Sequence, residues 1–261
     1  MNVLAIVQAR MGSTRLPGKV LRLINGKPLL ILLLERLKHS KVINRIVVAT
    51  SISKEDRSII NIAKSHGFAT FAGSENDVLD RAYQAAKQEG GRTLVRITGD
   101  SPLIDPFKVD GLIEFFLENR KRYDYVAFGK SFPEGQNAEV FSFKLLEAAC
   151  KEAKAPSERE HFTAFIWGQP QRFRCFRMES ERDHSRYRWT VDEPEDLTLV
   201  RRITKSLYQT GKCFTMEEII LLLEKNPRLQ KLNSGIKRDE GYLLSLAREG
   251  KGSLSHRESV V

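Results

Sequence analysis

The sequence contains few cysteines and no long hydrophobic run. Its 261 residues include three cysteines, Cys150, Cys175 and Cys213, and this odd, widely spaced set fits neither a disulfide framework nor a paired metal-binding pattern. The longest hydrophobic run, residues 28–34, is far shorter than the ~20 residues that span a bilayer. The N-terminus enters a strand pattern without the basic and apolar segments of a secretory signal. We therefore expect a cytoplasmic protein without membrane insertion.

Several nucleotide-binding and catalytic signatures are also absent. No Gly-x-Gly-x-x-Gly fingerprint follows the first strand pattern. A P-loop has four residues between its glycines and a serine or threonine after its lysine, whereas here residues 13–17 separate Gly12 from Gly18 and Val20 follows the lysine. No Ser/His/Asp or Cys/His arrangement suggests covalent catalysis. These absences argue against a dinucleotide-binding domain, a P-loop NTPase and a covalent mechanism.

Positive charge is in excess but scattered. The formal net charge is +10, from 43 Lys and Arg against 33 Asp and Glu. A basic surface attracts phosphate backbones, yet no nucleic-acid-binding motif accompanies this one. A small phosphorylated substrate explains the local basic clusters equally well, so we expect no specific nucleic-acid partner.

The first half of the chain alternates between strand and helix patterns. Strand patterns cover residues 2–7, 45–51, 69–73, 93–100 and 123–128, and helical patterns cover residues 28–40, 54–67, 76–91 and 105–120. This alternation predicts an α/β fold with a mostly parallel sheet and helices on both faces. In such sheets, ligands bind at the carboxyl ends of the strands.

The second half is less regular. It shows helical patterns at residues 142–153, 158–168 and 215–227, a strand pattern at 172–178, and a strand meeting a helix within 186–208. No linker separates two domains. We expect a single domain over residues 1–230 and a basic, flexible tail over residues 231–261.

A loop rich in glycine and cations follows the first strand pattern. In "QARMGSTRLPGKVL", Gly12 and Ser13 let backbone N–H groups approach a ligand, while Arg10, Arg15 and Lys19 supply positive charge. This combination suits a polyphosphate. The alternative is a surface loop whose charges are solvated.

Two aspartates stand where strand patterns end. Asp100 in "RITGDSPL" and Asp192 in "TVDEPEDL" are suited to hold one divalent cation together with nucleotide phosphates. Capping of a turn or a helix is the alternative for each. His161 in "EREHFT" is a candidate base, although a single histidine on a helix is more often structural.

These motifs, with "NDVLDRA" and "IVVATS" between them, resemble the cytidylyltransferase family of CMP-sugar synthetases. The resemblance is closest to the branch of spore coat polysaccharide biosynthesis protein F, which is related to CMP-KDO and acylneuraminate cytidylyltransferases. It covers about residues 1–205 in order, and the first motif is the most specific of the set.

The resemblance implies a Rossmann-like nucleotidyltransferase fold and a defined activity. Members transfer CMP from CTP to a sugar acid of the nonulosonic or keto-acid type and release pyrophosphate, for surface polysaccharide or glycan biosynthesis. It also implies Mg²⁺ as cofactor and suggests a homodimer. The residue roles that it implies are phosphate binding by Arg10, Gly12, Ser13, Arg15 and Lys19, magnesium binding by Asp100 and Asp192, and base or ribose contacts by Arg81 and Thr98. Arg15, Lys19, Asp100 and Asp192 would be the catalytic residues.

One stretch departs from the pattern of the branch. Members tend to carry Gly-Leu-Asp-x-Glu where this chain has "EGQNAEV", with Gln136 and Asn137 in place of Leu and Asp. In the family this region faces the acceptor, so the identity of the acceptor is in doubt. Glu139 remains a candidate acceptor or metal contact.

Two other functions fit part of the sequence. A glycosyltransferase of the same fold type would consume a nucleotide sugar, but such enzymes commonly carry Asp-x-Asp, and "GDSP" lacks the second acid. A non-catalytic nucleotide-binding protein would not need both Asp100 and Asp192.

Overall fold

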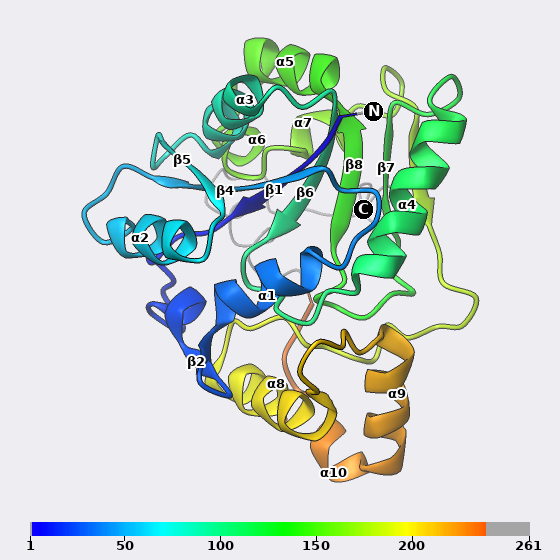
Figure 1. The fold of residues 1–261 in the computed structure, drawn as a ribbon. Helices are drawn as coiled ribbons and strands as arrows, with labels where there is room; N and C mark the ends of the chain where they lie inside the picture. The colour runs from blue at the N-terminus through cyan, green and yellow to red at the C-terminus, as the bar shows by residue number, and fades with distance from the viewer. Residues whose placement is uncertain (1, 239–261) are drawn as a thin grey trace.

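The computed structural model describes residues 2–238, which form an α/β fold around one seven-stranded sheet. The strand order is β5-β4-β1-β6-β8-β7-β9, and a two-stranded ribbon, β2 (Leu23–Ile24) with β3 (Lys27–Pro28), lies outside this sheet. Residues 239–261, most of the predicted tail, lie outside the described residues. Figure 1 shows the sheet in the centre of the molecule with helices around it.

Four neighbouring strands are parallel, as the alternating pattern predicts. They are β1 (Val3–Gln8), β4 (Arg45–Ser51), β5 (Ala69–Gly73) and β6 (Thr93–Thr98). Residues 3–7 of β1 are fully buried on both faces of the sheet. A continuous apolar run of this kind is typical of a central parallel strand.

The other half of the sheet is mixed. Strand β8 (Ala138–Ser142) runs antiparallel to β6 and to β7 (Tyr125–Phe128), while β9 (Cys175–Met178) runs parallel to β7. The sequence pattern did not predict strand β8, because its stretch "AEVFS" is short and Glu139 interrupts the apolar residues. The structure explains this glutamate, because Glu139 faces Arg96 of β6 in an ion pair.

Helices cover both faces of the sheet. One hydrophobic cluster contains Val3, Ala5 and Val7 of β1, and the other contains the alternating Leu4 and Ile6. The first cluster includes residues of α1 (Leu29–Leu37), α2 (Arg57–Ser65), α4 (Pro106–Asn119), α8 (Pro194–Leu207) and α9 (Met216–Lys225). The second includes residues of α3 (Val78–Glu89), α5 (Phe143–Glu152) and α7 (Ala164–Trp167). The helices that complete the described chain are η1 (Lys19–Leu21), α6 (Pro156–Glu160) and α10 (Pro227–Gln230).

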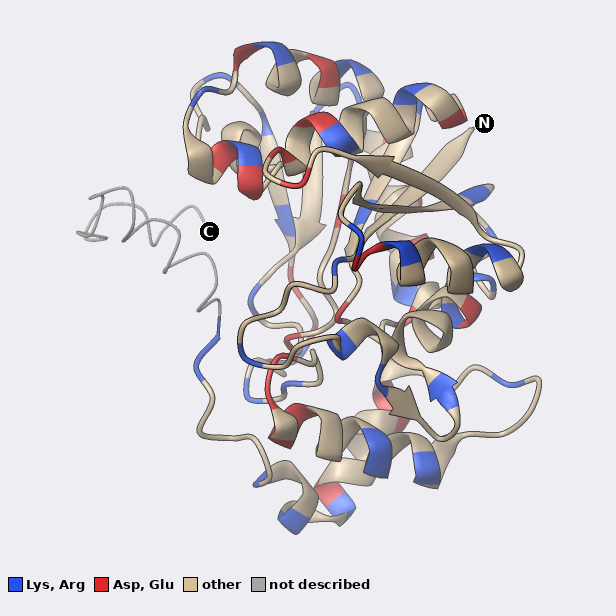
Figure 2. Ribbon diagram, turned by 90° about the vertical axis from the view of Figure 1, so that its left-hand side faces the viewer, with Lys and Arg blue, Asp and Glu red and all other residues tan. Residues whose placement is uncertain are grey.

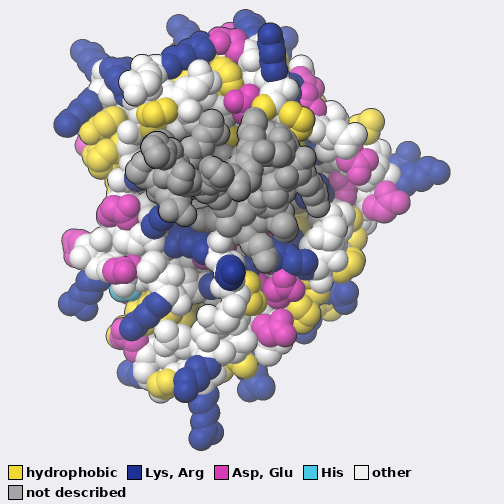
Figure 3. Space-filling view, turned by 180° about the vertical axis from the view of Figure 1, so that it is seen from behind, with side chains coloured by type: hydrophobic (Ala, Val, Ile, Leu, Met, Phe, Trp, Pro, Cys, Tyr) yellow, Lys and Arg dark blue, Asp and Glu magenta, His cyan; other side chains and the backbone are white. Residues whose placement is uncertain are grey.

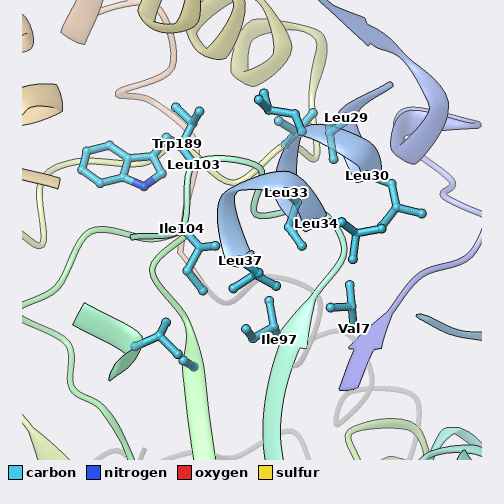
Figure 4. Packing of buried hydrophobic residues seen from close by; sticks show 14 of the residues in the cluster. Val7, Leu29, Leu30, Leu33, Leu34, Leu37, Ile97, Leu103, Ile104 and Trp189 are labelled. Atoms are coloured by element: carbon cyan, nitrogen blue, oxygen red, sulfur yellow. The ribbon is translucent and has the colours of Figure 1, made fainter. Parts of the chain in front are cut away.

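Helix α1 is buried almost all round and forms the centre of the first cluster. Its leucines pack against Val7 of β1 and Ile97 of β6, and Ile104 and Trp189 come from loops near the carboxyl ends of the strands (Figure 4). A helix that is apolar all round belongs in a core. The loops after β1 and β6 are therefore attached to strands that pack against a well-buried helix.

The predicted helix over residues 158–168 is interrupted. Helix α6 ends at Glu160, and α7 begins at Ala164. His161 has a non-helical backbone, with φ −101° and ψ 74°. The apolar periodicity of this stretch could not reveal the break, which places His161 beside the site described below.

The charged side chains are distributed over the whole described molecule. Lys and Arg occur on helices at both ends of the fold and around its rim, with Asp and Glu between them (Figures 2 and 3). Among residues 2–238, no helix combines the length and the apolar character that a membrane crossing needs.

Candidate active site at the carboxyl edge of the sheet

The loops after β1 and β6 leave the same edge of the sheet, because Gln8 and Thr98 are paired neighbours. Gly99 follows β6 and donates its backbone N–H to the carbonyl of Gln8 at 2.8 Å. A Cβ at this position would meet that oxygen at 2.7 Å and Ala9 Cβ at 3.0 Å, so only glycine allows the approach. This close contact fixes the start of the Asp100 loop against the glycine-rich loop.

The segment that carries Asp192 is docked onto the backbone of Asp100. The carbonyl of Asp100 accepts hydrogen bonds from the backbone N–H of Val191 at 2.8 Å and from the hydroxyl of Thr190 at 3.3 Å. The two predicted metal ligands therefore come together although 92 positions separate them in the sequence.

Lys19 lies between these two carboxylates. Its Nζ is 2.9 Å from Asp100 Oδ2 and 2.6 Å from Asp192 Oδ1. Gly18, which precedes it, has a left-handed backbone with φ 67° and begins the short helix η1. The glycine thus turns the chain so that Lys19 points into the site.

The three charges stabilise one another. Burial alone would lower the pKa of Lys19, but the carboxylates of Asp100 and Asp192 outweigh it and raise the pKa above its ordinary value. Burial would likewise raise the pKa of Asp100, and the charge and hydrogen bond of Lys19 lower it instead. Lys19 and Asp100 are therefore both charged at neutral pH.

The other residues of the glycine-rich loop are placed differently. Arg15 contacts Glu193 at 3.1 Å and Asp192 at 3.7 Å. Arg10 is exposed and forms no hydrogen bond or ion pair with another described residue. Ser13 donates its backbone N–H to the Met11 carbonyl at 2.8 Å, which closes a tight turn around Gly12.

A buried carboxylate that the sequence analysis missed holds this loop in place. Asp56, at the start of α2, accepts the Met11 N–H at 2.7 Å through Oδ1. Its Oδ2 accepts hydrogen bonds from the hydroxyl of Thr50 at 3.0 Å and of Ser51 at 2.6 Å. In the sequence, Asp56 is only one of several polar residues before a helix, so no local signal distinguishes it.

The site opens into two cavities that share a border. One has a volume of about 340 Å³ and the other about 290 Å³. The larger, the loop-side cavity, is lined by every predicted site residue except Gly12: Arg10, Ser13, Arg15, Lys19, Arg81, Thr98, Asp100 and Asp192. Arg15, Thr98, Asp100 and Asp192 also line the smaller one.

Arg81 and Thr98, the predicted base or ribose contacts, both line the loop-side cavity. Arg81 is 3% exposed, donates from Nη1 to the Ser74 carbonyl at 2.8 Å, and has no described hydrogen-bond partner for its Nε. Thr98 lies at the end of β6, with its hydroxyl 3.1 Å from that of Ser101.

The smaller cavity, here called the β7-side cavity, extends over strands β7 to β9. Asn137, Glu139, Arg96 and Arg177 are among its lining residues. Gln136 is not, because it is fully buried: its Nε2 donates to the Leu103 carbonyl at 2.9 Å, and its Oε1 accepts the Asp105 N–H at 2.8 Å. The glutamine therefore holds the Asp100 loop instead of facing a ligand.

Arg96 is a second residue that the sequence analysis missed. It contacts Glu139, the Gln8 side chain at 3.1 Å and the Thr163 hydroxyl at 3.2 Å. A charged residue inside the apolar strand "TLVRIT" was the available signal. His161 lines both cavities, and burial, followed by the charge of Arg96, lowers its pKa to about 4. His161 is therefore neutral at pH 7 and a weak base.

The two aspartates fit a magnesium site. Their oxygens converge on one position, which the ammonium group of Lys19 takes here. Magnesium in nucleotide-binding proteins commonly takes one or two carboxylates together with phosphate oxygens and waters. Among the described residues, no group of three or more His, Cys, Asp or Glu forms a complete protein cage.

A mostly parallel sheet with cations and paired aspartates at its carboxyl edge defines a Rossmann-like nucleotidyltransferase. The sequence comparisons specify the class further. The family model described as "Cytidylyltransferase" matches residues 4–226, and the chain belongs to this family. It is therefore an enzyme of the nucleotidyltransferase class that uses CTP.

Three of the proteins to which the chain is similar match most of its length. It is 40% identical to the uncharacterized protein MJ1063 of Methanocaldococcus jannaschii, covering 91% of this chain and 96% of that one. It is 34% identical to the spore coat polysaccharide biosynthesis protein SpsF of Bacillus subtilis, covering 87% and 95%. A cytidylyltransferase structure from Leptospira borgpetersenii superposes with a TM-score of 0.84 at 36% identity, covering 88% and 97%.

Proposed function

We propose that this cytidylyltransferase transfers CMP from CTP to a sugar acid and releases pyrophosphate. The observation that carries the proposal is the convergence of Lys19, Asp100 and Asp192 at the border of two cavities. A transferase that joins two substrates needs one cavity for each, and the reacting atoms must meet between them. The relationship to a polysaccharide biosynthesis protein supports a sugar as acceptor.

The loop-side cavity would hold CTP. Arg10, Arg15 and Lys19 would bind its phosphates, with backbone N–H groups of Gly12 and Ser13, as in other anion sites rich in backbone donors. Arg81 and Thr98, which line the same cavity, would contact the base or the ribose.

The β7-side cavity would hold the acceptor. Arg96, Lys130, Arg177 and Arg188 line it, and positive charge of this kind favours an anionic ligand. Arg177 is half-buried, and its side chain forms no hydrogen bond or ion pair with another described residue. A carboxylate on the acceptor would give this guanidinium a partner.

The reaction would be an in-line nucleotidyl transfer. A hydroxyl of the acceptor attacks the α-phosphorus of CTP, the bond to the bridging oxygen breaks, and pyrophosphate leaves with that electron pair, while the hydroxyl proton passes to solvent. Arg15 and Lys19 would offset the charge that grows on pyrophosphate. Magnesium, held by Asp100 and Asp192, would polarise the α-phosphate and lower the pKa of the attacking hydroxyl. No covalent intermediate is required.

Calorimetric titration with CTP, UTP, ATP and GTP, each with and without Mg²⁺, tests the nucleotide half of this proposal. We expect selective CTP binding that Mg²⁺ strengthens. Asp100→Asn should abolish the effect of Mg²⁺ and reduce turnover at least about a hundredfold, because one ligand charge is lost. Asp124→Asn is the control, because Asp124 pairs with Arg174 away from both cavities.

A screen of sugar acids for pyrophosphate release tests the acceptor half. The proposal is wrong if Asp100→Asn keeps the Mg²⁺ effect, or if the protein prefers a nucleotide sugar to CTP. The second result would support a glycosyltransferase.

We also propose that the protein is a homodimer and is cytoplasmic. Light scattering of the purified protein tests the homodimer.

A further inference from the structure

A buried arginine beside the site contacts three carboxylates. Arg188 is 8% exposed and lies four residues before Asp192. Its Nε and Nη2 each donate to Asp196 at 3.0 Å, and Nη2 also donates to Asp192 Oδ2 at 2.8 Å. Its Nη1 lies 2.5 Å from Glu134 Oε2. All three guanidinium nitrogens are therefore engaged by protein carboxylates.

Asp192 presents its two oxygens to different partners because of this contact. Oδ2 accepts the hydrogen bond from Arg188 at 2.8 Å and lies 3.7 Å from Arg15 Nη2, while Oδ1 faces Lys19 at 2.6 Å, on the side of Asp100. Rotation of the carboxylate would break the bond to Arg188. The orientation of Oδ1 toward the predicted cation position thus depends on the guanidinium.

The guanidinium itself has little freedom. The backbone of Glu134 pairs with the chain on both sides of Arg188, through Glu134 N–H to the Tyr187 carbonyl at 3.0 Å and Trp189 N–H to the Glu134 carbonyl at 2.8 Å. Asn233 donates to the Arg188 carbonyl at 3.0 Å and to Asp196 Oδ1 at 2.7 Å. Both ends of the arginine are therefore fixed.

We propose that Arg188 is a positioning residue that fixes the Asp192 carboxylate for metal binding. This inference rests on the proposed function, because it takes Asp192 as a ligand of the divalent cation. Arg188 acts through Asp192 and not by contacting substrate, although it lines the β7-side cavity, because its nitrogens already have carboxylate partners. Outer partners of this type orient metal ligands in many proteins.

The arrangement requires arginine rather than any cation. The planar guanidinium donates to both oxygens of Asp196 and, from the same plane, to Asp192. Lysine would keep the positive charge but offers a single nitrogen, so it cannot hold Asp196 and Asp192 in this geometry. Arg188→Lys therefore removes the hydrogen-bond geometry that positions Asp192 while it keeps the positive charge.

Binding of Mn²⁺ in the presence of saturating CTP, followed by electron paramagnetic resonance, tests this role without an acceptor. Arg188→Lys should weaken the apparent Mn²⁺ affinity by about 10- to 100-fold, the usual effect of losing an outer partner. CTP affinity measured without metal should change less than about twofold, since Arg188 does not line the loop-side cavity.

Arg36→Lys is the matched control. Arg36 is also buried, at 4% exposure, but it donates to the carbonyls of Ile104 and Phe214 and to no site carboxylate. Its replacement should lower thermal stability while Mn²⁺ affinity stays at the wild-type value. A loss of Mn²⁺ affinity in both variants would mean that Arg188 is merely structural, and would overturn the proposal.

A second variant keeps the proposal testable if Arg188→Lys does not fold. Asp196→Asn preserves size but weakens the anchor of the guanidinium, whose charge is then shared by Glu134 and Asp192, where it competes with the metal. We expect a smaller loss of Mn²⁺ affinity than in Arg188→Lys.

Unchanged Mn²⁺ affinity in the variants that fold would refute the positioning role while leaving the proposed function intact. Absence of CTP-dependent Mn²⁺ binding in the wild type would instead refute the proposed function, and this inference with it.

Discussion

At the scale of single residues, two kinds of partner compete for the ammonium group of Lys19: the carboxylates of Asp100 and Asp192, and the proposed phosphates of CTP. Its ammonium group contacts both carboxylates proposed to hold magnesium, and it belongs to the loop proposed to bind phosphates. A divalent cation next to the ammonium group would be repelled by it. Lys19 must therefore leave Asp100 and Asp192 when metal and CTP bind, and the phosphates offer the replacement partner. Metal and nucleotide should accordingly bind best together.

Lys19→Met tests this exchange. Methionine approximates the length of lysine without its charge, so we expect Mn²⁺ to bind the protein without CTP about tenfold more tightly than the wild type, which corresponds to about 1.4 kcal/mol. CTP binding should weaken, because a phosphate contact is lost. Paramagnetic resonance measures the first quantity and calorimetry the second.

The control is Lys27→Met, which removes an ammonium group that pairs with Glu35 at 2.6 Å outside both cavities. It should change neither affinity. If Lys19→Met leaves the affinity for Mn²⁺ unchanged, the contact between Lys19 and the carboxylates does not restrict the metal position.

At the scale of elements, the phosphate loop depends on a neighbouring helix. The chain from β1 to η1 is tied by the Met11 N–H to Asp56, and the same carboxylate is fixed by Thr50 and Ser51 at the end of β4. The loop is thus part of a hydrogen-bonded unit of β1, β4 and α2. Its shape should survive without a ligand.

Asp56→Asn should weaken both this unit and nucleotide binding. The amide has one acceptor oxygen, so either the Met11 N–H or the hydroxyls of Thr50 and Ser51 lose their partner. We expect a loss of about 1–3 kcal/mol in the free energy of unfolding and weaker CTP binding. Thr50→Val removes one hydrogen bond from the same carboxylate without touching the loop, and should reduce stability alone. Equal CTP affinity in the two variants would contradict this role of Asp56.

Elements with strong periodicity were predicted correctly, and those fixed by distant contacts were not. The alternation of the first half predicted the parallel strands and their helices, because each pattern reflects local burial. Strand β8 and the break at His161 depend on contacts with β6, β7 and Arg96, which a local pattern does not contain. The same holds for Asp56 and Arg188, whose contacts come from partners on other segments. Asp100 and Asp192 were predicted as site residues from the strand patterns before them. The structure has a strand before Asp100 but only an isolated bridge, Glu134 with Arg188, before Asp192.

At the scale of the whole molecule, the last described residues pack beside the candidate active site. Residues 231–238, which the sequence analysis assigned to the tail, contact the domain: Asn233 bonds to Arg188 and Asp196, and Arg238 donates to the carbonyls of Lys130 and Phe132 at 2.8 and 3.0 Å. Lys237 and Arg238 line the β7-side cavity. The β7-side cavity is thus lined in part by the last described residues, whereas the loop-side cavity is lined in part by the loop after β1.

This division predicts that the two substrates respond to different arginines. Arg10 lines only the loop-side cavity and Arg177 only the β7-side cavity, and neither forms an ion pair with another described residue. Arg10→Gln should weaken CTP binding about tenfold, in the range expected for one charge-assisted hydrogen bond. Arg177→Gln should leave CTP affinity within about twofold and raise the KM of the sugar acid, because its guanidinium would bind the acceptor carboxylate.

Each arginine is the control for the other, since both substitutions remove one positive charge from the same edge of the sheet. Calorimetry with CTP and a pyrophosphate-release assay over a range of acceptor concentrations distinguish the two effects. If Arg177→Gln weakened CTP binding as much as Arg10→Gln, the general positive potential of the edge would control binding, and separate cavities for the two substrates would be wrong. If each variant affected one substrate only, the border at Asp100 and Asp192 would be where the two substrates meet.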